Sequence, residues 1–306
     1  MTGSGPACSI QPAGFLLALT EEWSIEAVSA NIGDFVDCNA GELIGRPASD
    51  VLAEDAVHAL RNRLALLRDR DGVERLLACQ LTRDDRSFDV AIQFSGDLII
   101  IEAEPATART YGDMTATLRG MFARVDQGTD LADFLSEATK QLRALTGFDR
   151  VLILRFGEDW SSDVVAEYAR GGVASLLGDH IAADRLPLEE RRCLQRAPLH
   201  LAADLEAGLI PLLVGGERGP PDLARAILRP VATAYHEQLR GMNARAAMSI
   251  ALIVGGSLWG IIACLHHAPR SPGFERRSMA DLFAQLLALR IEILELKAAA
   301  GTGANG

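Results

Sequence analysis

The chain has 306 residues, is 49% hydrophobic and carries a formal net charge of −11. That length allows two domains, each with its own core. The acidic balance, without a long basic run, excludes a bulk electrostatic attraction to nucleic acid. The longest apolar stretch, MSIALIVGGSLWGIIACL, is interrupted by glycine and serine, which favours a hairpin over a membrane span. The first residues lack the charged start of a signal peptide, so we expect a cytoplasmic protein.

In the first third of the chain, GFLLAL and SIEAVSA are strand-like runs separated by a polar turn. Residues 53–68 show the apolar spacing of a helix. The runs LLACQLT, SFDVAIQF and DLIIIEAE follow with short turns, and Pro105 closes the block. Consecutive strands with tight links indicate an antiparallel sheet. A helix over about 114–127 leads onward.

The second block opens with a helix in TDLADFLSEATKQLRALTG, where Thr129 or Asp130 is the expected N-cap and Gly147 the C-cap. RVLILRF and DVVAEYA are the next predicted strands. Residues 172–221 hold many Pro and Gly residues and predict an irregular stretch. A helix is expected to follow over about 223–241.

The end of the chain combines a hairpin with a long helix. AAMSIALIV and SLWGIIACLHH flank Gly255-Gly256, a pair typical of a type I′ turn. In FERRSMADLFAQLLALRIEILELKAA, apolar residues recur every three or four positions. They are Leu282, Leu286, Leu289, Ile293 and Leu296. We expect this helix to pack on its domain and to form a homodimer with a partner helix.

Together these elements predict an α+β protein with two antiparallel sheets flanked by helices. We place a first domain at 1–108, a linker helix at 109–128, a second domain with the C-terminal helix at 129–299, and a flexible tail at 300–306. Patterning alone assigns no function to this architecture.

The chain resembles the bacterial phytochromes. The matching runs are TGFDRVLILRF, EDWSSDVVAEYA and LRPVATAYHEQLRGMNARAAMSIALIVGGSLWGIIACLHHAP, and SIQPAGFLLAL is similar to the family's Ile-Gln-Pro-His-Gly segment. The resemblance implies a PAS domain at 1–108 and a GAF domain at 129–299. It also implies a pocket for a linear tetrapyrrole, usually biliverdin, and a role in sensing red and far-red light.

The resemblance further implies a Cys that bonds the chromophore, an Asp-Ile-Pro motif and a helix His that hold the pyrrole nitrogens, and Arg partners for the propionates. The attachment Cys belongs about ten residues ahead of Ile10, where only nine residues stand, and Cys8 does not match that place. Arg185 stands at the Asp position, where its charge would oppose a cationic bilin. Because Cys8 does not match the attachment position, we also expect any bound bilin to lack a covalent bond.

Within LRPVATAYHEQLRGM, an ungapped comparison places Tyr235 at the position of the family's His. His236 is turned from it by about 100°, so only one of the two side chains can face a pocket, and a one-residue slip would exchange them. Tyrosine offers a hydrogen bond but lacks the proton exchange of an imidazole near neutrality. We expect Tyr235 to face the pocket.

Three further positions match family contacts in part. Arg229 matches a propionate-binding Arg, His200 stands where a second Arg is expected, and His266 matches a His at the end of the hairpin. Leu154 replaces an aromatic residue and Ala232 replaces a Ser. The sum of these exchanges predicts a phytochrome-type pocket whose bilin binding is weak, noncovalent or lost.

Two other chemistries deserve comparison. Cys264 and His266 share one strand face beside His267, but no second ligand pair has suitable spacing, so we predict a buried hairpin end in place of a metal site. Cys193 and Cys264 make a thiol-based redox sensor an alternative. The cysteines, which also include Cys38 and Cys79, are odd in number and scattered, which favours reduced thiols.

Three functions therefore remain as alternatives. The chain is a working biliverdin photoreceptor, a light-independent sensor that signals by redox change or through a downstream signalling protein, or a dimeric scaffold. No nucleophile–base arrangement or phosphate-binding loop is evident, so we expect no enzymatic activity. The adjacent Glu189 and Glu190 are interpreted as a solvated face. Neither nucleic acid nor a membrane is an expected partner.

Overall fold

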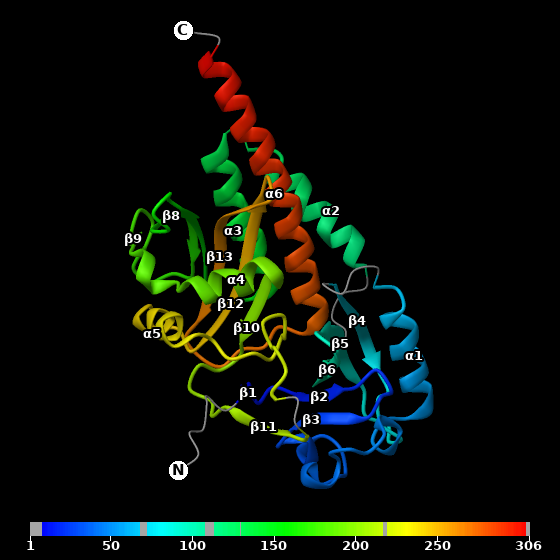
Figure 1. The fold of residues 1–306 in the computed structure, drawn as a ribbon. Helices are drawn as coiled ribbons and strands as arrows, with labels where there is room; N and C mark the ends of the chain where they lie inside the picture. The colour runs from blue at the N-terminus through cyan, green and yellow to red at the C-terminus, as the bar shows by residue number, and fades with distance from the viewer. Residues whose placement is uncertain (1–7, 68–71, 108–112, 129, 217–218, 304–306) are drawn as a thin grey trace. The chain divides into compact units, whose positions relative to one another are not determined.

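The computed structural model describes residues 8–67, 72–107, 113–128, 130–216 and 219–303 (Figure 1). The chain divides into two compact units. The first comprises residues 1–108 and 206–230, and the second comprises 109–205 and 231–306. Each predicted domain was one continuous stretch, with residues 206–230 in the second domain. In the structure this segment belongs to the first unit. The helix that was predicted as a linker falls within the second unit.

The first unit is built on a seven-stranded antiparallel sheet in the order β1-β11-β3-β2-β6-β5-β4. Its strands are β1 (Ser9–Ile10), β2 (Phe15–Leu19), β3 (Ile25–Ser29), β4 (Val73–Cys79), β5 (Phe88–Ser95), β6 (Leu98–Pro105) and β11 (Ile210–Val214). Helix α1 (Glu54–Leu64) packs Ala56 and Leu60 into the core on one face. The short helices are η1 (Ile32–Asp34), η2 (Ala40–Glu42) and η3 (Ala48–Asp50). The strands predicted in the first third are confirmed.

Strand β11 comes from a segment that sequence patterning predicted to be irregular. It pairs with both β1 and β3 and so completes the first sheet. The buried carboxylate of Glu102 accepts hydrogen bonds from the backbone N–H groups of Ile227, at 3.0 Å, and Leu228, at 2.7 Å. Gln11 donates from Nε2 to the carbonyl of Arg229 at 2.8 Å. These bonds satisfy buried polar groups and fix the segment to the first unit.

The second unit is built on a six-stranded antiparallel sheet in the order β10-β12-β13-β7-β8-β9. Its strands are β7 (Arg150–Phe156), β8 (Ser162–Ala169), β9 (His180–Ile181), β10 (Leu199–Ala202), β12 (Ala246–Val254) and β13 (Ser257–His266). Its helices are α2 (Met114–Val125), α3 (Leu131–Thr146), η4 (Ala183–Arg185), α4 (Leu188–Arg196), α5 (Thr233–Gly241) and α6 (Phe274–Gly303). The α+β class with antiparallel sheets and a long C-terminal helix is confirmed.

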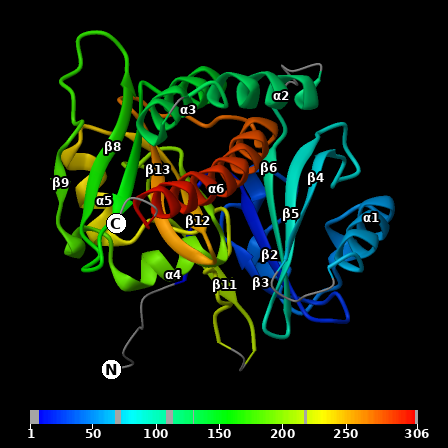
Figure 2. The same cartoon turned by 90° about the horizontal axis from the view of Figure 1, so that it is seen from above.

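The two faces of this second sheet carry different helices. Helices α2, α3 and α6 lie on one face (Figure 2). They bury a large core against it, to which Phe134 and Phe283 contribute. The other face meets η4, α4 and α5, through residues such as Leu194 and Leu239. Alternation along the strands separates the two cores, because successive side chains point to opposite faces.

Several local signals in the sequence act as predicted. Asp130 caps α3 by accepting the N–H of Asp133 at 2.9 Å, and Gly147 ends that helix with a φ of 68°. Gly255 and Gly256 both have positive φ, 56° and 79°, as the predicted type I′ turn requires. Thr129, the alternative cap, lies outside the described residues.

Two predicted elements were wrong in extent. The helix expected from about residue 223 begins only at Thr233, because Pro230 lacks an N–H and disfavours a helical conformation at the residue before it. The stretch 172–221 contains β9, η4, α4, β10 and β11. The many Pro and Gly residues there concealed short elements that pair with or pack on distant parts of the chain.

Helix α6 buries a different face from the predicted apolar stripe. The inward residues include Met279, Phe283, Leu287 and Ile291. Four of the five stripe residues point outward instead: the exposed fractions are 45% for Leu282, 60% for Leu289, 44% for Ile293 and 65% for Leu296, while Leu286 is half-buried. No helix among the described residues has the length and apolar character that a membrane crossing requires.

Candidate functional site

A small cavity lies on the sheet face that carries η4 and α5. Its volume is ≈ 30 Å³. The walls are mainly apolar and include Leu154, the residue that stands where the resemblance implies an aromatic ring. The polar residues that line it are Ser162, Arg185, Tyr235 and Gln238.

Tyr235 and His236 of α5 point in different directions. Tyr235 lines the cavity, is 7% exposed, and places its hydroxyl 2.7 Å from the hydroxyl of Ser249 on β12. Nε2 of His236 lies 2.6 Å from the carbonyl oxygen of Leu205, and His236 is not part of the cavity wall. The side chain that the helix presents to the cavity is therefore a phenol.

Ser249, His200 and Glu190 form a row of buried polar residues on this sheet face. His200 on β10 lies directly opposite Ser249 on β12, so the two side chains share a face. Nδ1 of His200 is 4.0 Å from Oε1 of Glu190, and both side chains are almost fully buried. Oε2 of Glu190 accepts the N–H of Ala232 at 3.4 Å. The row thus joins β12, β10 and α4 to the start of α5.

The interpretation of Glu189 and Glu190 as a solvated face was wrong for Glu190. Glu189 is exposed, but Glu190 is only 2% exposed. Residues of a helix that follow one another differ by about 100° in direction, so one carboxylate faces solvent while the other turns inward. The composition of the pair gave no signal of this. Ser249 was also missed, although it is a lone polar residue in the apolar run AAMSIALIV.

Arg185 lies at the edge of the cavity. Its side chain is 52% exposed, and its Nε is 3.8 Å from Oδ1 of the neighbouring Asp184. An exposed pair of this kind holds its partners weakly. The wall therefore carries a guanidinium group where the resemblance implies an Asp.

The remaining predicted residues lie elsewhere. Arg229 is 4% exposed and belongs to the first unit, as part of segment 206–230. His266 ends β13 and lines a second, larger pocket of ≈ 250 Å³ together with His267 and Asp149. The cavity therefore collects Tyr235 and Arg185, and His200 joins the polar row next to it.

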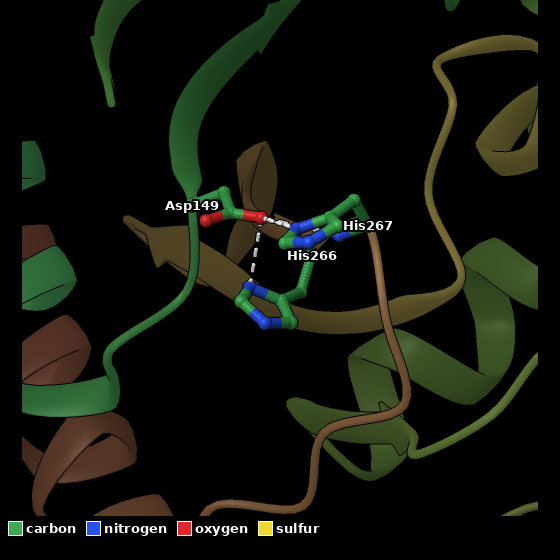
Figure 3. Close-up of side chains that lie close together, drawn as sticks. All are labelled: Asp149, His266 and His267. Atoms are coloured by element: carbon green, nitrogen blue, oxygen red, sulfur yellow. Dashed lines mark hydrogen bonds and ion pairs between the residues drawn. The ribbon is translucent and has the colours of Figure 1, made fainter. Parts of the chain in front are cut away.

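Asp149, His266 and His267 form a compact cluster (Figure 3). Nδ1 of His266 is 3.0 Å from Oδ2 of Asp149, and Nδ1 of His267 contacts the same oxygen. Burial lowers the pKa of His266; the charge of Asp149 opposes this shift, and the nearby Arg270, His267 and Arg170 add to it. Partial burial alone would raise the pKa of Asp149, but its hydrogen bonds with His267 outweigh burial and lower it. The cluster thus brings two imidazole rings to one carboxylate.

The cysteines named for redox chemistry come from opposite faces of the second sheet. Cys264 is fully buried in the core under α3 and α6, and burial raises its pKa to about 12. Cys193 is part of α4, which packs on the other face through Leu194. In the first unit, burial and the charge of Asp222 raise the pKa of Cys8.

The PAS fold family matches residues 6–106, and the GAF domain family matches residues 130–293. A bacteriophytochrome of Pseudomonas aeruginosa is 35% identical over 215 residues, which are 68% of this chain and 29% of that protein. The phytochrome-like protein Cph1 of Synechocystis sp. is 29% identical over 94% of this chain and 39% of its own length. The chain thus spans well under half the length of these curated relatives.

The similarity extends to solved structures. The chromophore-binding domain of an unusual bacteriophytochrome from R. palustris has a TM-score of 0.83 and 28% identity, covering 95% of this chain and 97% of that one. The GAF match alone covers more than half of the 306 residues, and the PAS match fills most of the preceding part. The chain therefore belongs to the GAF domain family and is a phytochrome-like PAS–GAF module of the bacteriophytochrome type.

Proposed function

We propose that this module is a phytochrome-type sensor whose GAF cavity has exchanged its bilin contacts, so that a linear tetrapyrrole binds weakly, without a covalent bond, or not at all. The observation that carries the proposal is the placement of Tyr235 and Arg185 in one cavity wall. A phenol and a guanidinium group offer no negative charge to a protonated bilin, which is a buried cation that needs complete polar partners.

The size of the cavity supports the same proposal. A volume of ≈ 30 Å³ corresponds to about one water molecule, whereas pockets for small ligands have about 300–1,000 Å³. A tetrapyrrole therefore does not fit between the residues present unless η4 or α5 moves. The hydrogen bond between Tyr235 and Ser249 opposes such a movement of α5.

The thiol chemistry also supports noncovalent binding. Cys8 is the cysteine nearest to the Ile-Gln-Pro segment, and its Sγ lies 3.8 Å from the carbonyl oxygen of Pro221. Because burial and Asp222 raise its pKa, Cys8 is a poor nucleophile near neutral pH.

A biliverdin titration tests the proposal. We expect no red or far-red absorbance band at stoichiometric biliverdin, or a weak band that is lost on gel filtration. A denaturing gel illuminated for zinc-induced fluorescence should show no chromophore attached to the chain. A stable band with full occupancy would contradict the proposal.

The second candidate is a working biliverdin photoreceptor. It is favoured by the similarity to proteins named bacteriophytochrome and to a chromophore-binding domain. In that case Tyr235 and the buried His200 would contact the bilin. Reversible absorbance changes under alternating red and far-red light would establish this function.

We also propose that the module acts without enzymatic chemistry, as a cytoplasmic homodimer that passes its signal to a downstream signalling protein. The exposed stripe of α6 supports the dimer, because four large apolar side chains on one helix face are costly in water. The structure gives no support to a redox role for the pair Cys193 and Cys264, since Cys264 faces the core on one side of the sheet and α4, which carries Cys193, packs on the other side.

A further inference from the structure

We propose that Asp149, His266 and His267 form a binding site for a divalent transition-metal ion, for which zinc is the test ion. This site is independent of the chromophore proposal. One ligand atom from each of the three residues lies within 4.8 Å of the others. The two imidazole rings approach the same carboxylate oxygen from different sides (Figure 3).

The spacing suits a metal ion with little rearrangement. Zinc binds imidazole nitrogen and carboxylate oxygen at about 2.0–2.2 Å, so tetrahedral ligands lie about 3.4 Å from one another. Nδ1 of His266 is already 3.0 Å from Oδ2 of Asp149. A slight outward rotation of the exposed His267 ring would open the space between the three atoms.

The residue types define the class of metal. Two imidazoles and one carboxylate favour Zn²⁺, Ni²⁺ or Cu²⁺ over the harder Mg²⁺ and Ca²⁺, which prefer oxygen ligands. All three residues line the pocket of ≈ 250 Å³, which leaves room for water or another ligand at a fourth position. The geometry matches a three-ligand site with one open position.

His266 supplies an independent indication. Its Nδ1 is buried and has no hydrogen-bond partner within the described part of the chain, although Oδ2 of Asp149 is 3.0 Å away. A buried ring nitrogen that no hydrogen bond satisfies is costly unless a ligand completes it.

The carboxylate is held in place by its own neighbours. The carbonyl of Asp149 accepts the N–H of Arg170 at 2.8 Å and Nε of Arg143 at 3.3 Å. Nε of Arg170 is 3.6 Å from Oδ1, which leaves Oδ2 directed at the histidines. The backbone N–H of His267 donates to Oδ2 at 3.2 Å. Such outer contacts orient a metal ligand and restrict its motion.

Nearby arginines set the limit on affinity. Arg150 is neutralised by Glu167, with Nε and Oε1 at 3.1 Å. Arg170 competes directly with a metal ion for Asp149, because its guanidinium pairs with the same carboxylate. We therefore expect modest, micromolar binding, and we expect Arg170→Gln to bind zinc more tightly than the original chain.

The test is calorimetric titration of the full, untagged chain with ZnCl₂. We expect one site, with affinity reduced about tenfold or more in His267→Ala and in His266→Gln. The control is His180→Ala, which removes another His–Asp contact, between His180 and Asp163 at 2.7 Å on the surface, and should leave the affinity unchanged. Circular dichroism and thermal unfolding without metal would show that each variant is folded.

Cobalt spectra separate this site from the thiols. Co²⁺ at the proposed site should give visible bands of a nitrogen and oxygen ligand set, and these bands should disappear in His267→Ala. Thiolate-to-cobalt charge-transfer bands would place the metal on a cysteine and overturn the proposal. Equal zinc affinity in the original chain, His267→Ala and His266→Gln would also overturn it, as would an absence of binding in Arg170→Gln.

Discussion

The hydroxyl of Tyr235 lies 2.7 Å from the hydroxyl of Ser249, and both residues are buried. The contact joins α5 to strand β12 next to the cavity. The phenol therefore has a structural partner within the protein, in addition to its place in the cavity wall. This arrangement links the stability of the second unit to the residue that stands where the family resemblance implies a His.

Removal of this hydroxyl is expected to destabilise the protein. Tyr235→Phe leaves the Ser249 hydroxyl buried without this partner and should lower the free energy of unfolding by about 1 kcal/mol. Urea unfolding followed by circular dichroism measures the loss. In a double-mutant cycle with Ser249→Ala, the two effects should be less than additive. Strict additivity would show that the hydroxyls do not interact.

Bilin affinity should rise when the two altered contacts are exchanged together. The double substitution of Arg185→Asp and Tyr235→His supplies a carboxylate and an imidazole to the cavity wall, so we expect at least about tenfold tighter biliverdin binding, which corresponds to about 1.4 kcal/mol. Absorbance titration gives the affinity. The matched control is Arg192→Asp, which makes the same charge change on α4 at an exposed residue outside the cavity wall. An equal gain in the control would assign the effect to net charge.

Dimer formation should depend on the outward stripe of α6. Leu289→Asp places a charge on a side chain that is 60% exposed, so the fold should persist while a packed helix pair would separate. Light scattering coupled to gel filtration reports the mass. Leu177→Asp alters a leucine that is 59% exposed outside any helix or strand and should have no effect. An unchanged mass for Leu289→Asp would argue against a dimer through this stripe.

Cys264 should resist alkylation in the folded protein. Its pKa is raised to about 12 by burial, so at pH 8 only about one thiol in 10,000 is a thiolate, and the reactive form is lost as pH falls below 12. Mass spectrometry after iodoacetamide treatment should find Cys264 unmodified until denaturant is added, whereas the partly exposed Cys193 provides the internal comparison. Modification of Cys264 in the native state would show that the core under α6 opens.

Gly260 should be intolerant of any side chain. It lies in β13 opposite β7, where an added Cβ would be 2.2 Å from the carbonyl oxygen of Leu154. Gly260→Ala must therefore displace backbone next to the cavity wall, at a cost of about 1–3 kcal/mol. Gly171→Ala, with open space around its Cβ, is the control and should unfold like the original chain. Equal thermal stability of the two variants would refute the expected clash.

Local physics in the sequence determined most elements of this fold. The cap at Asp130, the left-handed Gly147 and the Gly255-Gly256 turn depend only on neighbouring residues, and each has the predicted conformation. Strands and helices followed from apolar periodicity, because burial of one face repeats at the period of the element itself. The family resemblance rested on runs of this kind.

Tertiary structure alone decided the features that depend on distant contacts. Strand β11 completes the sheet of the first unit because β1 and β3 leave backbone groups between them, which no pattern within 206–230 reveals. Glu190 turns inward to a row that begins on β12. Asp149 and His267 meet across 118 positions of the sequence. The order of the strands in the sheet brings such distant side chains together. Interactions between neighbouring residues in the sequence do not determine that order.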